Sequence, residues 1–216
     1  MKQQLNWRVG ILFGVLAAGL AACTEPVKPE PPAQALPSAQ VALQNAKDAY
    51  QRKDYAQAAE WFRKAAEQGD VKGQYNLGLF YSDGKGVGQD YAQAAQWFRK
   101  AADQGLAQAQ NNLGFLYQQG QGVPKDPAQA AQWFRKAADQ GYTQAQKNLG
   151  LAYRDGLGVK KDPAQAKLWL GKAAAQGDAE AQAALKEIGK GAKPAAKTNP
   201  KPKAAQTSKP PAGGKQ

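Results

Sequence analysis

The sequence predicts an all-α solenoid, and three observations lead to this prediction. Four tryptophans recur at a constant spacing of 36 residues, and the residues around them repeat nearly unchanged. Apolar residues within each repeat follow the 3.6-residue period of a helix. Aspartate and glycine residues bracket these apolar segments at fixed positions. Such self-similarity is typical of units that bury their apolar faces by stacking on their neighbours. The tryptophans are Trp61, Trp97, Trp133 and Trp169.

The segment 90–105, DYAQAAQWFRKAADQG, predicts an amphipathic helix. Ala94, Trp97, Phe98 and Ala101 fall at i, i+3, i+4 and i+7, so they form one apolar stripe. An aspartate starts each copy and a glutamine follows three residues later, which predicts a reciprocal capping box. A glycine ends each copy, as expected of a residue with positive φ after a helix. The aspartates are Asp54, Asp90, Asp126 and Asp162, the glutamines Gln57, Gln93, Gln129 and Gln165, and the glycines Gly69, Gly105, Gly141 and Gly177.

The other half of each repeat, which reads QYNLGLFYSDGKGV over residues 74–87, predicts a second helix followed by a loop. Leu77 and Gly78 lie on one side of this helix. Glycine inside a helix costs about 1 kcal/mol relative to alanine, so its recurrence at Gly114 and Gly150 predicts close approach of a neighbouring helix. We interpret the GxGV segment as a turn between helices rather than a phosphate-binding loop, because no strand precedes it.

The pattern LGxxYxxGxGVxxDxxxAxxWFxKAAxxG resembles the Sel1-like repeat family, a relative of the tetratricopeptide repeat with a longer loop between its two helices. Three full copies span residues 73–177. The preceding unit has a shorter loop and is similar to an ordinary tetratricopeptide unit. The final helix has Lys186 in place of the glycine and Gly189 in place of the tyrosine, so we interpret it as a terminal cap. The resemblance implies a right-handed α-α solenoid over residues 39–189.

Residues 1–22 predict a lipoprotein signal peptide. Lys2 and Arg8 precede an uncharged run of 14 residues, which is about 21 Å long and therefore too short to cross a bilayer. The run ends in Leu-Ala-Ala-Cys, which resembles a bacterial lipobox and implies lipidation of Cys23. The alternative is an ordinary secretory signal with a chance cysteine. Thr24 resembles an outer-membrane sorting signal, so we expect an anchored lipoprotein at the outer membrane, facing the periplasm.

Residues 23–38 predict a proline-rich tether, and residues 190–216 predict a disordered tail rich in lysine, proline and alanine. The tail carries seven lysines and no acidic residue, out of a net charge of +12 for the chain. Because the repeats themselves are close to neutral and exported proteins seldom meet nucleic acid, nucleic-acid binding is poorly supported. The tail is suited to contact peptidoglycan, another anionic glycan or acidic lipid, or simply to increase solubility.

The composition argues against an enzyme, and we expect no cofactor and no metal. The sequence contains no histidine and a single cysteine, Cys23, so the commonest general base and the commonest metal ligands are missing. Ser82 and Lys85 match the S-x-x-K motif of penicillin-recognising enzymes, but the accompanying S-D-N and K-T-G motifs are absent. The recurring aspartates occur once per repeat and do not converge, so we interpret them as helix caps.

The candidate site is a partner-binding groove along the first helix of each repeat, at positions where the repeats differ most. For the apolar positions the alternative is packing between repeats, and for Tyr75, Asn111 and Lys147 it is a plain solvated surface. The predicted groove residues are Tyr75, Leu79, Ser82, Asn111, Phe115, Gln118, Lys147, Leu151 and Arg154.

The sequence therefore favours a non-catalytic scaffold for protein–protein interaction, anchored by lipid in the bacterial cell envelope. Its partner would be a protein or a peptide, and acyl chains on Cys23 would hold it at the membrane. Two other functions are compatible with parts of the sequence. One is binding of the cell wall or an anionic glycan through the basic tail. The other is an envelope hydrolase using Ser82 and Lys85, which the absence of histidine disfavours.

Overall fold

The computed structural model describes residues 37–189, which contain nine α-helices and no strand. The all-α solenoid prediction is confirmed. The predicted signal peptide, Cys23, the tether up to residue 36 and the tail from residue 190 lie outside the described residues. The helices are α1 (Ala39–Gln51), α2 (Tyr55–Glu67), α3 (Val71–Asp83), α4 (Tyr91–Asp103), α5 (Ala107–Gln119), α6 (Pro127–Asp139), α7 (Thr143–Asp155), α8 (Pro163–Ala175) and α9 (Ala179–Gly189).

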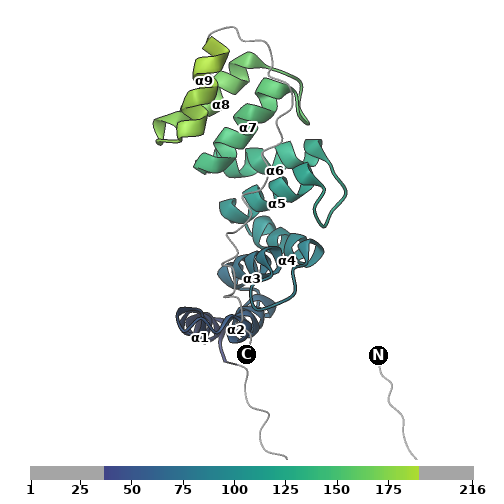
Figure 1. The fold of residues 1–216 in the computed structure, drawn as a ribbon, viewed down its shortest axis with the longest axis vertical. Helices are drawn as coiled ribbons and strands as arrows, with labels where there is room; N and C mark the ends of the chain where they lie inside the picture. The colour runs from purple at the N-terminus through teal and green to yellow at the C-terminus, as the bar shows by residue number, and fades with distance from the viewer. Residues whose placement is uncertain (1–36, 190–216) are drawn as a thin grey trace, which may run out of the picture. The chain divides into compact units, whose positions relative to one another are not determined.

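Successive helices pack against one another in chain order, so the described part is a stack of helix pairs (Figure 1). The odd-numbered helices come first in each pair and the even-numbered helices second. Beyond these chain neighbours, α1 contacts α3 and α7 contacts α9, so these odd-numbered helices lie side by side. The first pair is joined by residues 52–54, whereas the later pairs have longer loops such as residues 84–90.

Aspartates cap the even-numbered helices, as predicted. The carboxylate of Asp90 accepts from the amides of Ala92 at 2.9 Å and Gln93 at 3.0 Å, and equivalent bonds start α6 and α8. The other half of the predicted capping box, a glutamine side chain bonding back to the aspartate amide, is wrong for the described helices. The amide of Asp90 already donates to the carbonyl of Tyr81 at 2.9 Å, so it is no longer available to the glutamine.

The helical glycines permit close helix packing, also as predicted. A Cβ atom added to Gly78 would lie 2.6 Å from the ring of Phe98, and one added to Gly114 would lie 2.8 Å from Phe134. The loop glycine Gly122 has a φ of 69° and would place a Cβ 2.2 Å from the carbonyl oxygen of Tyr91. The GxGV segment is therefore a turn that packs on the start of the preceding even-numbered helix.

Alanine, leucine and phenylalanine side chains dominate the core, which forms three clusters: one over α1–α3, a larger one over α4–α8, and one formed by α8 and α9. Three glutamines are also buried, each 5% exposed: Gln74, Gln110 and Gln146. The Gln146 amide nitrogen donates to the carbonyl of Ala138 in α6, and its oxygen accepts from Gln176 after α8 at 2.8 Å. Each buried glutamine therefore connects three consecutive helices, a role that the sequence pattern did not reveal.

Candidate functional site

The nine predicted groove residues lie on α3, α5 and α7, three on each helix. We call their surface the odd-helix face. Because the repeats share one length, each helix presents the same three positions, 36 residues apart. The members are Tyr75, Leu79 and Ser82 on α3, Asn111, Phe115 and Gln118 on α5, and Lys147, Leu151 and Arg154 on α7.

The apolar members of the odd-helix face differ in how far they are covered. Leu79 packs against the main core cluster, and Leu151 packs against the cluster formed by α8 and α9. Phe115, at the equivalent position on α5, has 46% of its surface exposed. Packing between repeats therefore accounts for the two leucines, and Phe115 is the exposed large apolar side chain of this face.

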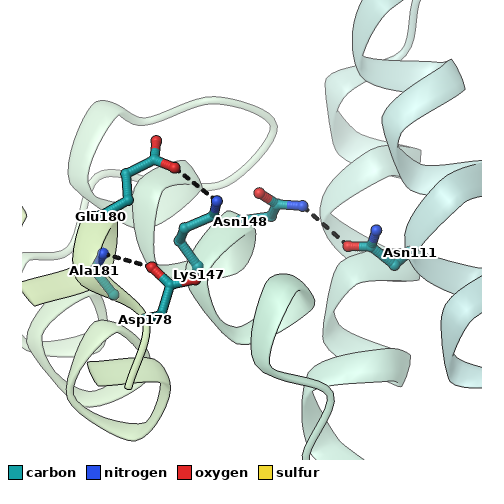
Figure 2. A network of polar contacts seen from close by, with 6 residues as sticks. All are labelled: Asn111, Lys147, Asn148, Asp178, Glu180 and Ala181. Carbon is teal, nitrogen blue, oxygen red and sulfur yellow. Dashed lines mark hydrogen bonds and ion pairs between the residues drawn. The ribbon is translucent and has the colours of Figure 1, made fainter. Parts of the chain in front are cut away.

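Two polar members of the face are engaged inside the molecule. Asn111 is 9% exposed, and its side-chain oxygen accepts from the amide of Asn148 on α7 at 3.0 Å (Figure 2). Burial raises the pKa of Tyr75 above its ordinary value, and the neighbouring Tyr142 adds to this, while a hydrogen bond with Asn112 partly opposes it. Asn111 is thus a link between repeats rather than a solvated residue. The Tyr75 hydroxyl stays protonated and is suited to donate a hydrogen bond.

The two cations of the face form ion pairs. The Lys147 ammonium lies 2.7 Å from the Glu180 carboxylate of α9 (Figure 2). Arg154 binds the carboxylate of Asp155 through two bonds of 2.8 and 2.9 Å, and lies 3.7 Å from Glu187. The bond to Asp155 is the main cause of the raised pKa of Arg154. The end of the face nearest α9 is therefore charged, whereas the α3 and α5 part is uncharged and carries the two aromatic side chains, Tyr75 and Phe115.

Ser82 and Lys85 do not form a catalytic pair. The Ser82 hydroxyl lies 2.9 Å from the carbonyl of Leu79, in its own helix, and donates to it. Lys85 donates to the Tyr50 hydroxyl at 2.8 Å, and its ammonium lies over the rings of Tyr50 and Tyr55. The bond to Tyr50 raises the pKa of Lys85, whereas a general base at neutral pH needs a lowered one.

No group of three or more potential metal ligands lies close together in residues 37–189. Nor does any helix of the described part have the length and apolarity needed to cross a membrane.

Two surface depressions are lined by none of the nine predicted residues. One, of about 550 Å³, is lined by Tyr153, Lys160 and Lys161 among others, and one of about 400 Å³ lies between α4 and the loop after α5.

Comparison with protein families identifies the repeat from which this chain is built. The family model for the Sel1 repeat matches residues 42–70, 71–106, 107–142 and 143–178, more than half of the chain. The chain belongs to the Sel1 repeat family. The model also matches the short leading unit, which spans α1 and α2. Sel1 repeats generally mediate protein–protein interaction, and the family is a non-catalytic scaffold fold.

Relatives of known sequence or structure share these repeats but are longer. Beta-lactamase HcpA of Helicobacter pylori is 40% identical over 78 residues, which are 36% of this chain and 28% of that protein. The crystal structure of c5321, a protective antigen of uropathogenic Escherichia coli with an SLR fold, matches with a TM-score of 0.68 and 44% identity, over 70% of this chain and 34% of c5321. A Sel1 repeat protein from Oxalobacter formigenes matches with a TM-score of 0.64 and 35% identity, over 70% of this chain and 63% of its own. The chain thus spans less than two thirds of each.

The structure adds residues that sequence reasoning missed. Asn148 and Glu180 hold Asn111 and Lys147 in place, and Glu187 contacts Arg154. Asn148 recurs as Asn76 and Asn112, which is a signal that could have been used. The two glutamates carry no such signal, because the capping helix departs from the repeat pattern.

Proposed function

We propose that this chain is a non-catalytic scaffold of the bacterial cell envelope that holds a partner protein on its odd-helix face. The observation that carries the proposal is the exposure of Phe115, at 46%, between repeats whose equivalent leucines are packed. A large apolar side chain at the centre of a variable surface is typical of a contact that a partner buries. Membership of a family whose repeats mediate protein–protein interaction supports the proposal.

The anchor in this proposal is the lipidated Cys23, joined to the repeats by the tether. Its support is the sequence of residues 1–23, which has the charge, length and final cysteine of a lipoprotein signal. Two or three acyl chains give stable anchoring, whereas one gives marginal binding. Replacement of Cys23 by serine should abolish incorporation of labelled fatty acid and release the protein from the membrane fraction.

Photocrosslinking in living cells tests the scaffold. A photoreactive amino acid is placed at Phe115 or Gln118, and at the exposed Gln96 and Gln132 of α4 and α6 as controls. We expect the first pair to capture one discrete protein, identified by mass spectrometry, and the controls to capture none. Correct export and folding without an adduct from any position would contradict the proposal.

A second candidate is binding of an anionic wall polymer. Lys160 and Lys161 are exposed and line the depression of about 550 Å³, and the seven lysines of residues 190–216 follow the last helix. Exposed cations gain affinity for an anionic surface by electrostatic attraction. Removal of residues 190–216 should then abolish retention on purified cell-wall material, whereas unchanged retention would exclude this role for the tail.

A further inference from the structure

The ion pair between Lys147 and Glu180 is unequal in its exposure. The Lys147 side chain is 13% exposed, so its position is fixed by the residues that cover it. The Glu180 side chain is 67% exposed and reaches the ammonium from α9. The cation thus belongs to the packed surface of α7, whereas the carboxylate is held mainly by the ion pair itself.

This cation lies on a helix that is hydrogen-bonded to the helix carrying Phe115. Lys147 neighbours Asn148, which donates to Asn111 on α5 at 3.0 Å. Asn111 is four residues before Phe115, so the two occupy the same side of α5. The asparagine pair therefore joins α5, the helix that carries Phe115, to α7, the helix that carries Lys147 (Figure 2). A partner segment that crosses from α5 to α7 would pass over the two helices that carry the ring and the ammonium.

The charged pair occurs once in the described repeats. The positions equivalent to Lys147 are Tyr75 and Asn111, and the positions equivalent to Glu180 are Gln108 and Gln144. The ion pair is therefore not a general requirement for stacking these repeats. It is a property of the boundary between α7 and the capping helix α9.

We propose that the Lys147 ammonium is a binding site for a carboxylate of the partner, and that Glu180 occupies this site until the partner displaces it. The ligand is an extended peptide segment with an acidic residue or a free carboxyl terminus, next to an apolar side chain that covers Phe115. This inference rests on the proposed function and names the chemistry of its partner. Charge complementarity supports it, because a carboxylate already occupies the site in the structure.

Competition by Glu180 is weak in this arrangement. The Glu180 side chain is 67% exposed, so its carboxylate remains largely solvated and loses side-chain freedom when it pairs with Lys147. An incoming carboxylate that also buries the Phe115 ring therefore outcompetes Glu180. Removal of the Glu180 charge should strengthen binding about two- to fivefold.

Selection from a random peptide library displayed on phage tests the inference. The library is selected on the full-length Glu180→Gln protein, and the enriched peptides are synthesised with each acidic side chain and the carboxyl terminus in acid or amide form. We expect the enriched peptides to carry a carboxylate near an apolar residue. Their affinity, measured by fluorescence anisotropy, should fall at least about tenfold for Lys147→Gln or for the matching amide, and recover with Lys147→Arg.

Matched variants separate this effect from net charge. Lys100→Gln changes an exposed lysine on α4, and Glu67→Gln changes an exposed glutamate at the end of α2. Neither should alter peptide affinity, and thermal unfolding should show that all variants fold. Failure to enrich any peptide, or equal binding of acid and amide forms, would overturn the carboxylate site. A discrete protein captured by photocrosslinking would still support the scaffold, so the two proposals fail separately.

Discussion

The contact residues of the even-numbered helices repeat with little change, whereas the residues of the odd-helix face differ from one repeat to the next. In every even-numbered helix a lysine ammonium lies about 4 Å from the ring centroid of a tryptophan three residues before it. An arginine of α2, α4 and α6 donates to a tyrosine hydroxyl of the next repeat. The odd-helix face has three different residues at each of its three positions, apart from the leucine shared by α3 and α7.

This difference indicates that residues repeat in this chain where the contacts between repeats are the same. Where each repeat meets the same neighbour, the same contact is selected in every copy, and the residues repeat. Arg99 is replaced by Gly171 in α8, and the partner tyrosine by Gly189 in α9, so both members of the contact are lost together where the stack ends. The variable positions have no such common contact, because the residue at each position meets a different neighbour in each repeat.

The largest contrast should come from two phenylalanines. Phe134 on α6 is 1% exposed and fills the space beside Gly114, whereas Phe115 on α5 is 46% exposed. We expect Phe134→Ala to lower the free energy of unfolding by about 3–5 kcal/mol because it leaves a cavity. Phe115→Ala should change it by about 0.5 kcal/mol while reducing partner capture. Urea unfolding followed by circular dichroism measures both, and similar losses for the two variants would remove the distinction.

Loop glycines give the next contrast. Gly122 has positive φ and lies against the Tyr91 carbonyl, whereas Gly88 has no positive φ and no neighbouring atom within 4 Å of the place that a Cβ would occupy. Gly122→Ala should cost about 2 kcal/mol from backbone strain and steric conflict. Gly88→Ala should be neutral or stabilise by up to about 1 kcal/mol, because it restricts the unfolded chain. Thermal unfolding of the two single variants provides the comparison.

Buried and exposed glutamines of α7 sharpen the comparison further. Gln146 is buried and bonded to Ala138 and Gln176, whereas Gln144, two residues earlier, is exposed. Gln146→Ala should lower the free energy of unfolding by about 1–3 kcal/mol because it leaves buried groups without partners. Gln144→Ala should change it by less than about 0.5 kcal/mol. Equal effects in urea unfolding would show that the glutamine contacts do not stabilise the stack.

Most of the fold could be predicted because its signals are local and repeated. The spacing of Trp97 and Phe98, the capping aspartates and the helical glycines each identify an element without knowledge of its neighbours. The burial of Gln146 was not predicted, because apolar periodicity assigns only apolar residues to the core and every glutamine to the surface. Its recurrence at Gln74 and Gln110 was the available signal, since a polar residue kept in a repeat is one that makes the same contact each time.

The candidate site was less predictable, because its geometry depends on contacts between repeats. The sequence places Asn111 and Lys147 at variable positions, but it does not show that Asn148 bonds to Asn111. Nor does it show that Glu180 reaches Lys147, since α9 does not follow the repeat pattern and the two residues are 33 positions apart. Variation identified three equivalent positions on each of α3, α5 and α7, whereas the contacts of each side chain required the structure.

The smallest expected effect concerns Tyr75, a variable residue whose pKa is raised by burial. Its pKa is raised above the ordinary value of 10.0, mainly by burial, so the folded state disfavours the tyrosinate. Below about pH 10 both states hold the proton and this contribution to stability is intact. As the pH rises from there through the raised pKa, the unfolded state ionises first and the contribution is lost. The free energy of unfolding should therefore decline more steeply with pH in this range for the unchanged protein than for Tyr75→Phe.

Asn112→Ala should raise the pKa of Tyr75 further, because the hydrogen bond from Asn112 lowers that pKa. Tyrosinate absorbance measures the Tyr75 pKa in the unchanged protein and in the Asn112 variant. An unchanged titration in the Asn112 variant would show that Asn112 does not hydrogen-bond to the Tyr75 hydroxyl.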